Sequence, residues 1–506
     1  MLELIDRLLN RTTMYRLVLY VCVAELALGA VLGGLGILPF SPVALILSTA
    51  VITATCILSN VVFARIMKAP VNRESAIITA LILALIISPI VPFQLPGLGF
   101  LVWASLLAMA SKYVIAADRD HVFNPAAFAV VITAVAVGQS ASWWVGSMSM
   151  LPAVAIGGAM IVRKIRREDL VWSFFAAALV TGAVTASSGS ALLSMERAVL
   201  HTPLIFFATL MLTEPLTTPP TRSLRIAYGA FVGFLSAPAI HVGAVYSTPE
   251  LALVVGNLFS YAVSPTGKHL LTLTSRVQLS RDSFEFVFSS PRPVPFRAGQ
   301  YMEWTLPHRS PDDRGVRRYF TMSSSPEDRM VKVGIKFCLE PSSFKKQMGD
   351  MVRGDVIMAG EIAGDFVLPR NRRKKLAFVA GGIGVTPFRS MVQSLIDRGE
   401  SRDVVLLYAN KTVEDIAYRD VFDEARTVIG MKTSYALSEV AQAPPNWNGP
   451  LGMLDARTIA EEIPDYADRL FYISGPHGMV TAFESSLAAM GVSHKNIKTD
   501  YFPGFV

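Results

Sequence analysis

The hydrophobic pattern of the chain changes near residue 266. Before that point long apolar runs follow one another with few charges between them, and after it short runs of alternating character are mixed with charged segments. A helix that crosses the hydrocarbon core of a bilayer needs about 17–25 mainly apolar residues. We expect ten membrane-spanning helices, near residues 15–38, 43–65, 74–91, 97–116, 124–138, 149–163, 170–188, 201–214, 226–241 and 250–264.

Alternating apolar and polar residues dominate the start of the second half. The stretches SFEFVF, YMEWTL, RRYFTMSS and VKVGIKF have a period of two, which predicts half-buried strands in a small antiparallel barrel. From Lys374 onward the pattern becomes strand, glycine-rich loop, helix and strand, which is typical of a doubly wound α/β domain. The predicted domains are a transmembrane domain at 1–266, a β-barrel at 267–370 and an α/β domain at 371–506.

Charge placement supports a membrane topology. The chain of 506 residues is 52% hydrophobic and 17% charged with a net charge of +7, which by itself could suggest nucleic-acid binding. The basic residues of the first half, however, gather in loops of one parity, and the opposite loops hold only Arg197. Cytoplasmic loops carry such an excess. We therefore expect a multi-pass protein of the cytoplasmic (inner) membrane, with both termini cytoplasmic, lipid around it and no nucleic-acid partner.

The cysteines exclude one class of redox centre. Cys22, Cys56 and Cys338 are the only three, and they are far apart in the sequence. A four-thiolate iron–sulfur cluster needs four ligands, so the chain cannot form one by itself. The spacing gives no disulfide framework either. We expect buried reduced thiols and no metal site.

Two polar segments interrupt the apolar half. In ADRDHVFNPAAFAVV (117–131), Asn124 and Pro125 have the chemistry of a helix start, an N-cap followed by proline at the first helical position. In LTEPLTTPPTRSLRIAYG (212–229), the prolines are typical of a helix end followed by a loop. Carboxylates and prolines at membrane depth are also found where a cavity is lined, so a functional interpretation stays open for both segments.

These two segments, in this order, resemble the paired signatures of a membrane family shared by the Rnf complex and the sodium-translocating NADH:quinone reductase. The resemblance spans most of residues 15–265. It implies a membrane electron-transfer domain of about ten helices with a bound flavin, FMN or riboflavin. On the matching motifs, the flavin would lie near Asn124, Pro125, Thr213, Glu214 and Pro215.

The chain departs from that family in one external loop. Many members carry there a threonine to which FMN is attached, whereas residues 138–150 contain no threonine, so we expect a non-covalent flavin. Trp143 and Trp144 in this loop are expected to anchor the membrane interface. Alternatively, they could receive a redox partner or cover the flavin.

Three motifs of the second half resemble the ferredoxin–NADP reductase superfamily: RRYFTMSSSP (317–326), GGIGVTPFRSM (381–391) and SGPHGMV (474–480). This resemblance covers about residues 268–506 and implies FAD and NADH or NADPH as cofactors. Arg318 would bind the phosphate of FAD, Phe320 would pack along the flavin, and Thr321 would place its hydroxyl near the reactive ring nitrogen. The segment EPSSFKKQMGDMVRGD (340–355) resembles the second phosphate element of the same superfamily and implies Ser342 and Ser343. The remaining cofactor-binding residues that the three motifs imply are Tyr319, Ser323, Ser324, Gly381, Gly382, Gly384, Thr386, Pro387, Gly475, Pro476 and Met479.

The same resemblance implies three catalytic residues: Thr321, Ser474 and Phe502. Ser474 stands where many relatives have cysteine, and its hydroxyl still permits hydride transfer. In the tail KTDYFPGFV, either Tyr501 or Phe502 would stack on the flavin. Acidic residues beside Lys411 favour NADH over NADPH.

Together the halves predict a single-chain oxidoreductase. Electrons would pass from cytoplasmic NAD(P)H through FAD and a membrane flavin to a quinone or an extracytoplasmic redox partner protein. A redox-driven Na⁺ or H⁺ pump is the alternative. A haem-based transmembrane reductase would need stacked axial histidines, and the membrane half offers only His121, His201 and His241, all near the ends of predicted spans.

Overall fold

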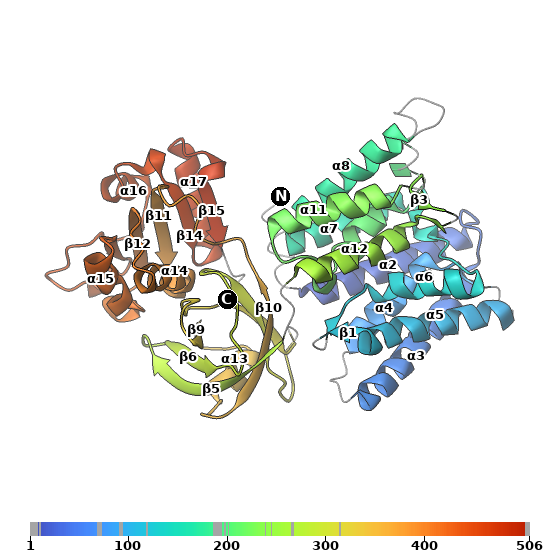
Figure 1. Cartoon of the computed structure of the whole chain (residues 1–506), viewed down its shortest axis with the longest axis horizontal. Coiled ribbons are helices and arrows are strands. Elements are labelled where there is room, and N and C mark those ends of the chain that lie inside the picture. The colour runs from blue at the N-terminus through green and yellow to red at the C-terminus, as the bar shows by residue number, and fades with distance from the viewer. Residues whose placement is uncertain are drawn as a thin grey trace. The chain divides into compact units, whose positions relative to one another are not determined.

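The computed structural model divides into two compact units, Met1–Gly267 and Lys268–Val506 (Figure 1). Each unit has its own hydrophobic core. The structure describes residues 9, 12–67, 73–90, 95–117, 120–185, 195–196, 199–200, 202–237, 239–243, 245–264, 268–312 and 315–500.

The first unit is helical. Its longer helices are α2 (Met14–Gly34), α3 (Pro42–Ile66), α4 (Arg73–Ile86), α5 (Leu95–Val114), α6 (Pro125–Val137), α7 (Leu151–Ile165), α8 (Glu168–Val184), α11 (Arg222–Leu235) and α12 (Pro249–Val263). Short elements complete it: β1 (Ala116–Ala117), β2 (Asp120–His121), η1 (Trp144–Gly146), α10 (Leu204–Phe206), the π-helix η2 (Phe207–Met211), η3 (Pro215–Thr217), β3 (His241–Val242) and β4 (Val245–Tyr246).

Every predicted apolar run contains a helix within the described residues. Most of these helices, however, are too short for the ten predicted membrane spans. Three helices there are long and apolar enough to cross a membrane: Met14–Gly34, Pro42–Ile66 and Gly97–Val114. The others are shorter, 13 residues in α6 and 17 in α8. At about 1.5 Å per residue they cover roughly 20–26 Å, less than the roughly 30 Å of the hydrocarbon core. The apolar runs include cap and loop residues that hydropathy alone does not separate from helix.

Capping residues explain where several of these helices begin. The side chains of Thr13, Ser41 and Asn124 accept hydrogen bonds from the backbone N–H groups three residues later, at 3.1–3.2 Å. Proline follows directly at Pro42 and Pro125, where its missing N–H costs nothing. The predicted helix-start chemistry of Asn124-Pro125 is therefore confirmed.

The two tryptophans of the loop at 138–150 pack inward, so the expectation that they anchor the membrane interface is wrong. Trp143 and Trp144 are only 9% and 8% exposed. The indole N–H of Trp143 donates to Glu250 Oε2 at 3.2 Å, and that of Trp144 donates to the carbonyl of Ala84 at 2.9 Å. The two indole rings are held in place because each N–H has a buried acceptor. Gly29, which has no side chain, leaves room for the Trp144 ring.

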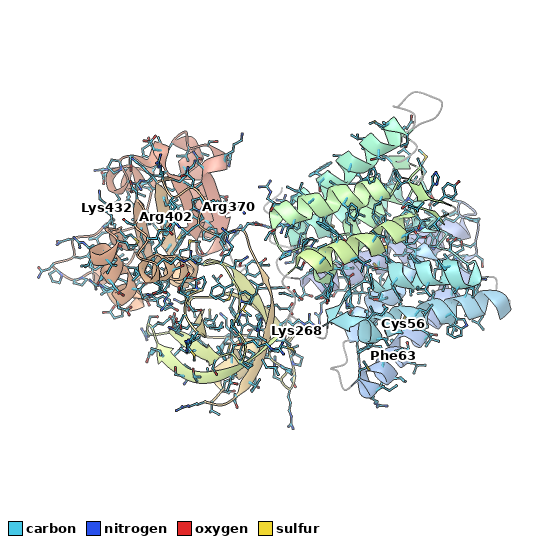
Figure 2. All side chains as sticks on the ribbon, in the orientation of Figure 1. Cys56, Phe63, Lys268, Arg370, Arg402 and Lys432 are labelled. Carbon is cyan, nitrogen blue, oxygen red and sulfur yellow. The ribbon has the colours of Figure 1, made fainter. Side chains whose placement is uncertain are left out.

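All three cysteines are free thiols, but only two of them are buried. Cys22 of α2 and Cys56 of α3 lie in the core of the first unit, and Figure 2 labels Cys56 among the side chains. Cys338 is exposed, because it follows the end of a barrel strand at Lys336. The expectation of buried thiols is therefore wrong for Cys338.

The second unit begins with an antiparallel barrel, as the period of two predicts. Its strand order is β8-β7-β10-β5-β6-β9, and a bridge between Met322 and Val333 joins the two edge strands. Phe286, Phe288, Trp304 and Met302 fill its core, on the alternate positions that face inward. The elements are β5 (His269–Gln278), β6 (Ser283–Ser289), β7 (Tyr301–Thr305), β8 (Arg317–Thr321), β9 (Met330–Lys336), α13 (Ser343–Gly349) and β10 (Val356–Ala363).

A five-stranded parallel sheet follows, in the order β13-β12-β11-β14-β15. Alternate residues of β11 face two cores: Phe378 packs with Phe388 of α14, and Val379 lies in the cluster of Val480 of α17. The predicted doubly wound domain is therefore confirmed. Its elements are β11 (Leu376–Gly381), η4 (Gly382–Val385), α14 (Thr386–Asp397), β12 (Val404–Asn410), η5 (Val413–Asp415), α15 (Arg419–Val428), β13 (Lys432–Leu437), η6 (Val440–Gln442), α16 (Ala456–Glu462), η7 (Tyr466–Asp468), β14 (Leu470–Ser474), α17 (His477–Ala489), η8 (His494–Asn496) and β15 (Ile497–Asp500).

Candidate functional site

In the first unit the two polar segments meet. Asn124, the N-cap of α6, donates through Nδ2 to Glu214 Oε2 at 2.9 Å. The other carboxylate oxygen of Glu214 lies 3.0 Å from Nε2 of His121. Residues about 90 positions apart in the sequence therefore form one cluster, which we call the Glu214 cluster: His121, Asn124, Glu214, Tyr228 and Asn257.

Asn257 of α12 and Tyr228 of α11 extend this cluster. Asn257 Oδ1 accepts from the backbone N–H of Asn124 at 2.8 Å, and its Nδ2 donates to the Tyr228 hydroxyl at 3.0 Å. Asn257 and Tyr228 are fully buried. Neither was selected from the sequence, because an asparagine and a tyrosine within apolar runs give no local signal.

The other predicted residues of this segment serve the backbone. Thr213 Oγ1 donates to the carbonyl of Thr209 at 2.7 Å, at the end of the π-helix η2, and Pro215 begins η3 directly after Glu214. π-Helices are rare and often occur at functional sites. Here the wide turn and the proline bring Glu214 to the start of α6. Of the other two histidines, His241 lies beside Tyr246 on the exposed hairpin of β3 and β4, and His201 is outside the described residues.

In the second unit, β8 carries the first predicted cofactor residues. Arg318 and Phe320 share one face of the strand and both contact Phe344 of α13, at 5.4 Å from the guanidinium carbon and 5.8 Å between ring centroids. Tyr319 points to the other face, where its hydroxyl donates to Glu303 at 3.0 Å. Arg318 thus lies at the start of α13, next to Ser342 and Ser343.

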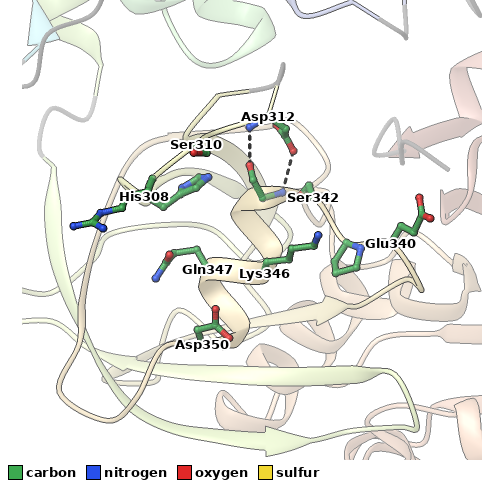
Figure 3. Close-up of a pocket in the computed structure, with 11 residues that line it drawn as sticks. His308, Ser310, Asp312, Glu340, Ser342, Lys346, Gln347 and Asp350 are labelled. Atoms are coloured by element: carbon green, nitrogen blue, oxygen red, sulfur yellow. Dashed lines mark hydrogen bonds between the residues drawn. The ribbon is translucent and has the colours of Figure 1, made fainter.

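An open pocket of about 640 Å³ lies at this point (Figure 3). Its lining includes Asp312, Ser342, Ser343 and Lys346. Asp312 Oδ1 accepts from Arg318 Nη2 at 3.0 Å, and Asp312 Oδ2 accepts from the backbone N–H of Ser343 at 3.0 Å. Ser342 Oγ caps α13 by accepting from Lys345 N at 3.3 Å.

These donors fit a phosphate group. A guanidinium and a helix-start N–H converge on one anion, the carboxylate of Asp312, which stands where a phosphate oxygen could be bound. Arg309 and Lys346 add positive charge to the lining, which also contains the carboxylates of Glu340 and Asp350. The residues present therefore fit the diphosphate of a flavin dinucleotide, with Arg318 and Ser343 as its holders.

Three other motif residues differ in whether a described residue already bonds to their hydroxyl group. The hydroxyl of Thr321 is buried and has no hydrogen-bond partner among the described residues, so it remains available to a ligand. Ser323 Oγ instead donates to Glu285 at 2.8 Å, and Ser324 Oγ accepts from Lys332 N at 3.1 Å. The structure gives these two serines protein partners.

The backbone carbonyls of the same serines join the barrel to the α/β domain. Arg389 of α14 donates to the carbonyl of Ser323 at 2.7 Å, and Ser390 donates to that of Ser324 at 2.6 Å. A side chain at Gly334 of β9 would collide with Tyr418 and Thr386. The motif RRYFTMSSSP therefore reaches α14, which begins at Thr386-Pro387 of the glycine-rich loop.

The two loops predicted to bind the nicotinamide cofactor lie against each other. A Cβ atom at Gly384 would lie 2.5 Å from the Cα of Gly475, and one at Gly381 would collide with Met479 and lie 3.2 Å from Pro476. Gly382 has a φ of +51°, which favours glycine. Both loops follow the carboxyl ends of adjacent parallel strands, β11 and β14, where open α/β sheets bind ligands.

Ser474 ends β14 at the same edge. Its hydroxyl is fully buried and has no hydrogen-bond partner among the described residues. It pairs in register with Ala380 of β11 on one side and with Asp500 of β15 on the other. Predicted Thr321 and Ser474 thus both offer a buried hydroxyl that no described residue uses.

Asp500 is a candidate that the motifs missed. One of its carboxylate oxygens is buried without a partner among the described residues, and burial raises the pKa of this carboxyl to about 7. An acid beside Ser474 that titrates near neutrality suits proton exchange. Its signal in the sequence was the single acid before the aromatic pair in KTDYFP. The predicted catalytic residue Phe502 lies outside the described residues.

Comparisons with known proteins agree with this geometry. Residues 378–485 match the oxidoreductase NAD-binding domain family. A flavohemoprotein of Bacillus subtilis is 27% identical over 217 residues, which are 42% of this chain and 53% of the relative. An NADH-cytochrome b5 reductase 1 of Aspergillus terreus is 25% identical over 240 residues, 45% of this chain and 80% of the relative.

A third relative, an NADPH oxidoreductase of Mycobacterium tuberculosis, is 26% identical over 204 residues, 40% of this chain and 50% of the relative. The chain thus spans about half the length of the flavohemoprotein and of this oxidoreductase. The second unit thus contains an oxidoreductase NAD-binding domain, and its relatives are named as flavohemoproteins, NADH-cytochrome b5 reductases and NADPH oxidoreductases, which is consistent with an NAD(P)H-dependent flavin oxidoreductase.

Proposed function

We propose that the whole chain is a transmembrane oxidoreductase. It would take electrons from cytoplasmic NAD(P)H at the second unit and deliver them through the first unit to a quinone or to an extracytoplasmic redox partner protein. The observation that carries this proposal is the Glu214 cluster, in which His121, Asn124, Tyr228 and Asn257 are buried around the partly exposed carboxylate of Glu214. A reductase domain fused to such a unit needs no soluble carrier between them.

Exposed apolar side chains support a lipid environment for the first unit. Leu58 of α3, Trp103 of α5 and Trp172 of α8 are all more than half exposed. Large apolar surfaces of this kind mark membrane or protein contacts. The placement of Lys and Arg in loops of one parity supports the proposed multi-pass topology, in which the shorter helices would tilt little or thin the bilayer locally.

The residues of the second unit have separate roles in this proposal. Arg318 and Ser343 hold the diphosphate of FAD, and the loops at Gly381–Gly384 and Gly475–Met479 hold the nicotinamide cofactor. FAD held by these residues would supply hydride acceptance and single-electron release. Thr321, Ser474 and Asp500 orient the reacting rings, exclude water and exchange the proton.

A second, non-covalent flavin (FMN or riboflavin) is proposed at the Glu214 cluster. The carboxylate of Glu214 and the imidazole of His121 offer an acceptor and a donor that suit the imide edge of a flavin ring. The absence of threonine in residues 138–150 supports non-covalent attachment. The resemblance of both segments to the membrane family of the Rnf complex points the same way.

Flavin extraction tests the proposal. Purified full-length protein is precipitated with acid, and the released flavins are separated and identified. We expect FAD together with FMN or riboflavin. Arg318→Ala should lose FAD alone, whereas Glu214→Gln should lose the second flavin alone. FAD as the only flavin would overturn the membrane-flavin step, a flavin left on the protein would contradict non-covalent attachment, and a haem absorption band would favour a haem reductase.

A second candidate function is a redox-driven H⁺ or Na⁺ pump, which Glu25 favours. This residue lies at the middle of α2, is 1% exposed, and neither of its carboxylate oxygens has a hydrogen-bond partner among the described residues. Ionisable groups at such depth often carry ions or protons. NADH-driven acidification of liposomes that contain the protein, lost in Glu25→Gln, would support pumping, and sodium dependence would favour Na⁺. No ion movement during NADH oxidation would exclude it.

A further inference from the structure

The loop that follows β7 places the carboxylate of Asp312 in the pocket of Figure 3, which we call the phosphate groove. Asp312 contacts Arg318 and Ser343 there: Oδ1 accepts from Arg318 Nη2 at 3.0 Å, Oδ2 accepts from Ser343 N at 3.0 Å, and its own N–H donates to Ser343 Oγ at 2.9 Å. Figure 3 draws the two hydrogen bonds with Ser343 as dashed lines. Arg318 and Ser343 are the groups that fit the diphosphate of FAD. We propose that Asp312 is an internal competitor of that diphosphate and sets the affinity of the protein for FAD.

This inference rests on the proposed function, in which FAD binds at this groove. A carboxylate and a phosphate cannot both occupy one pair of donors, because two anions in contact repel each other. Arg318 also donates to the carbonyls of Gly315 at 3.0 Å and Arg317 at 2.6 Å. Its guanidinium is therefore held in place by the backbone, and the carboxylate rather than the arginine must leave.

The position of Asp312 lets it leave at low cost. Its side chain is partly exposed, 29% compared with 15% for Arg318. Residues 306–312 form neither helix nor strand, and backbone hydrogen bonds hold the segment at its two ends, from Leu306 N to Val316 O at 3.0 Å and from Gly315 N to Asp312 O at 2.8 Å. The carboxylate can therefore leave Arg318 by a change of its own side-chain rotamer. FAD binding would then exchange the Asp312 contacts for contacts with phosphate, and the measured affinity would be the difference between the two sets.

A different role for Asp312 predicts the opposite sign. If its carboxylate stayed on Arg318 and oriented it while FAD was bound, removal of the negative charge would weaken FAD binding. If Asp312 competes, removal should strengthen it. The direction of the change in affinity therefore decides between a positioning residue and a competitor.

The test compares FAD affinity in full-length protein from which flavin has been removed. Asp312→Asn keeps the size of the side chain and an acceptor for the Ser343 N–H but loses the charge. Asp350→Asn is the matched control, because Asp350 lines the same pocket without a hydrogen bond to Arg318 or Ser343 among the described contacts. Asp312→Ser is a second variant in case the first perturbs the loop. Binding is followed by the quenching of flavin fluorescence.

We expect Asp312→Asn and Asp312→Ser to bind FAD about tenfold more tightly than the native protein, the order expected for loss of a charged competitor. Asp350→Asn should change the affinity by less than about threefold, and riboflavin, which has no phosphate, should bind all four proteins alike. Equal or weaker FAD binding by both Asp312 variants would overturn the inference. Failure of the native protein and every variant to bind FAD would instead overturn the proposed function.

Discussion

Gly384 has no side chain, and this allows two loops to approach each other closely. The glycine-rich loop after β11 and the loop after β14 approach so closely that a single methyl group at Gly384 would lie 2.5 Å from Gly475 Cα and 2.7 Å from the Ser474 carbonyl. Backbone cannot yield as a flexible side chain can, so the loops must separate. The nicotinamide cofactor is proposed to bind between these loops.

Gly384→Ala is therefore expected to slow reduction of the bound flavin by NADH about tenfold or more, with FAD content unchanged, because overpacking costs about 1–3 kcal/mol. Stopped-flow absorbance of the flavin measures the rate. Gly182→Ala in α8 is the control, since a Cβ at Gly182 meets nothing within 4 Å and Gly182 lies outside both loops. A native rate in Gly384→Ala would show that the loops can separate without consequence.

Asp500 gives the second unit a distinctive pH dependence. Burial raises its pKa to about 7, whereas an aspartate in an unfolded chain titrates near about 4. Between these values the folded state binds more protons, so the contribution of Asp500 to stability is present below about pH 4 and is lost as the pH rises to about 7. Asp465 behaves oppositely: hydrogen bonds from Arg469, and then Lys375, lower its pKa to about 2.

The quantity to compare is the temperature at which half of the FAD is released. We predict that the midpoint of Asp500→Asn minus that of the native protein rises progressively from pH 4 to pH 7. Asp465→Asn should lose stability relative to the native protein at neutral pH and approach it as the pH falls toward 2. The measurement is flavin fluorescence on heating. Parallel curves for Asp500→Asn and the native protein would mean that the Asp500 carboxyl titrates alike in the folded and unfolded chains.

At the scale of elements, α2 and α12 each bury a glutamate, with different surroundings. Glu25 of α2 has no hydrogen-bond partner among the described residues, whereas Glu250 of α12 accepts from the indole N–H of Trp143 at 3.2 Å. A buried polar group without a partner costs about 1–3 kcal/mol, and removal of a partner leaves its donor unsatisfied at similar cost.

Glu25→Leu is thus expected to stabilise the detergent-solubilised protein by about 1–3 kcal/mol, and Glu250→Leu to destabilise it by a similar amount. Thermal unfolding monitored by tryptophan fluorescence compares the two. Loss of stability in Glu25→Leu would reveal a partner for Glu25 in the membrane. The pair also separates the structural cost of Glu25 from the proton or ion transport tested with Glu25→Gln.

At the scale of the whole molecule, the proposed membrane location predicts that a charged substitution at an exposed apolar residue is costly in the first unit. The same substitution in the second unit should cost little. Leu58 of α3 is 68% exposed in the first unit, and Val352 is 66% exposed in the second. Lysine near the centre of a membrane helix costs about 2.5–3.5 kcal/mol. In water the same exposed side chain costs almost nothing.

We expect Leu58→Lys to reduce the amount of protein that stays with membranes after carbonate extraction, whereas Val352→Lys should leave it unchanged. Both variants are compared by immunoblot against the native chain. Full retention of Leu58→Lys would indicate that this face of α3 contacts protein or water rather than lipid.

The period of the hydrophobic pattern was enough to predict the barrel, the parallel sheet and the helical character of the first half, because burial of one face dictates each period. Motif order placed Arg318 and the serines at the start of α13 in the β-barrel, and the two glycine loops in the α/β domain. Ten spans did not follow, since hydropathy does not separate a helix from its apolar caps, and in the described residues only three helices reach the necessary length.

Only the tertiary structure decided which polar groups meet. Glu214 joins His121 and Asn124 because the chain breaks at the π-helix and at Pro215, and Trp143 turns inward because Glu250 accepts its N–H. Asp500 pairs in backbone register with Ser474 on the neighbouring strand. These pairs join residues far apart in the sequence, whereas Asp312 and Arg318 are six positions apart. No local pattern encodes any of these pairs. The sequence by itself determined the elements and their chemistry, and folding determined the pairs, because burial leaves each polar group in need of a partner.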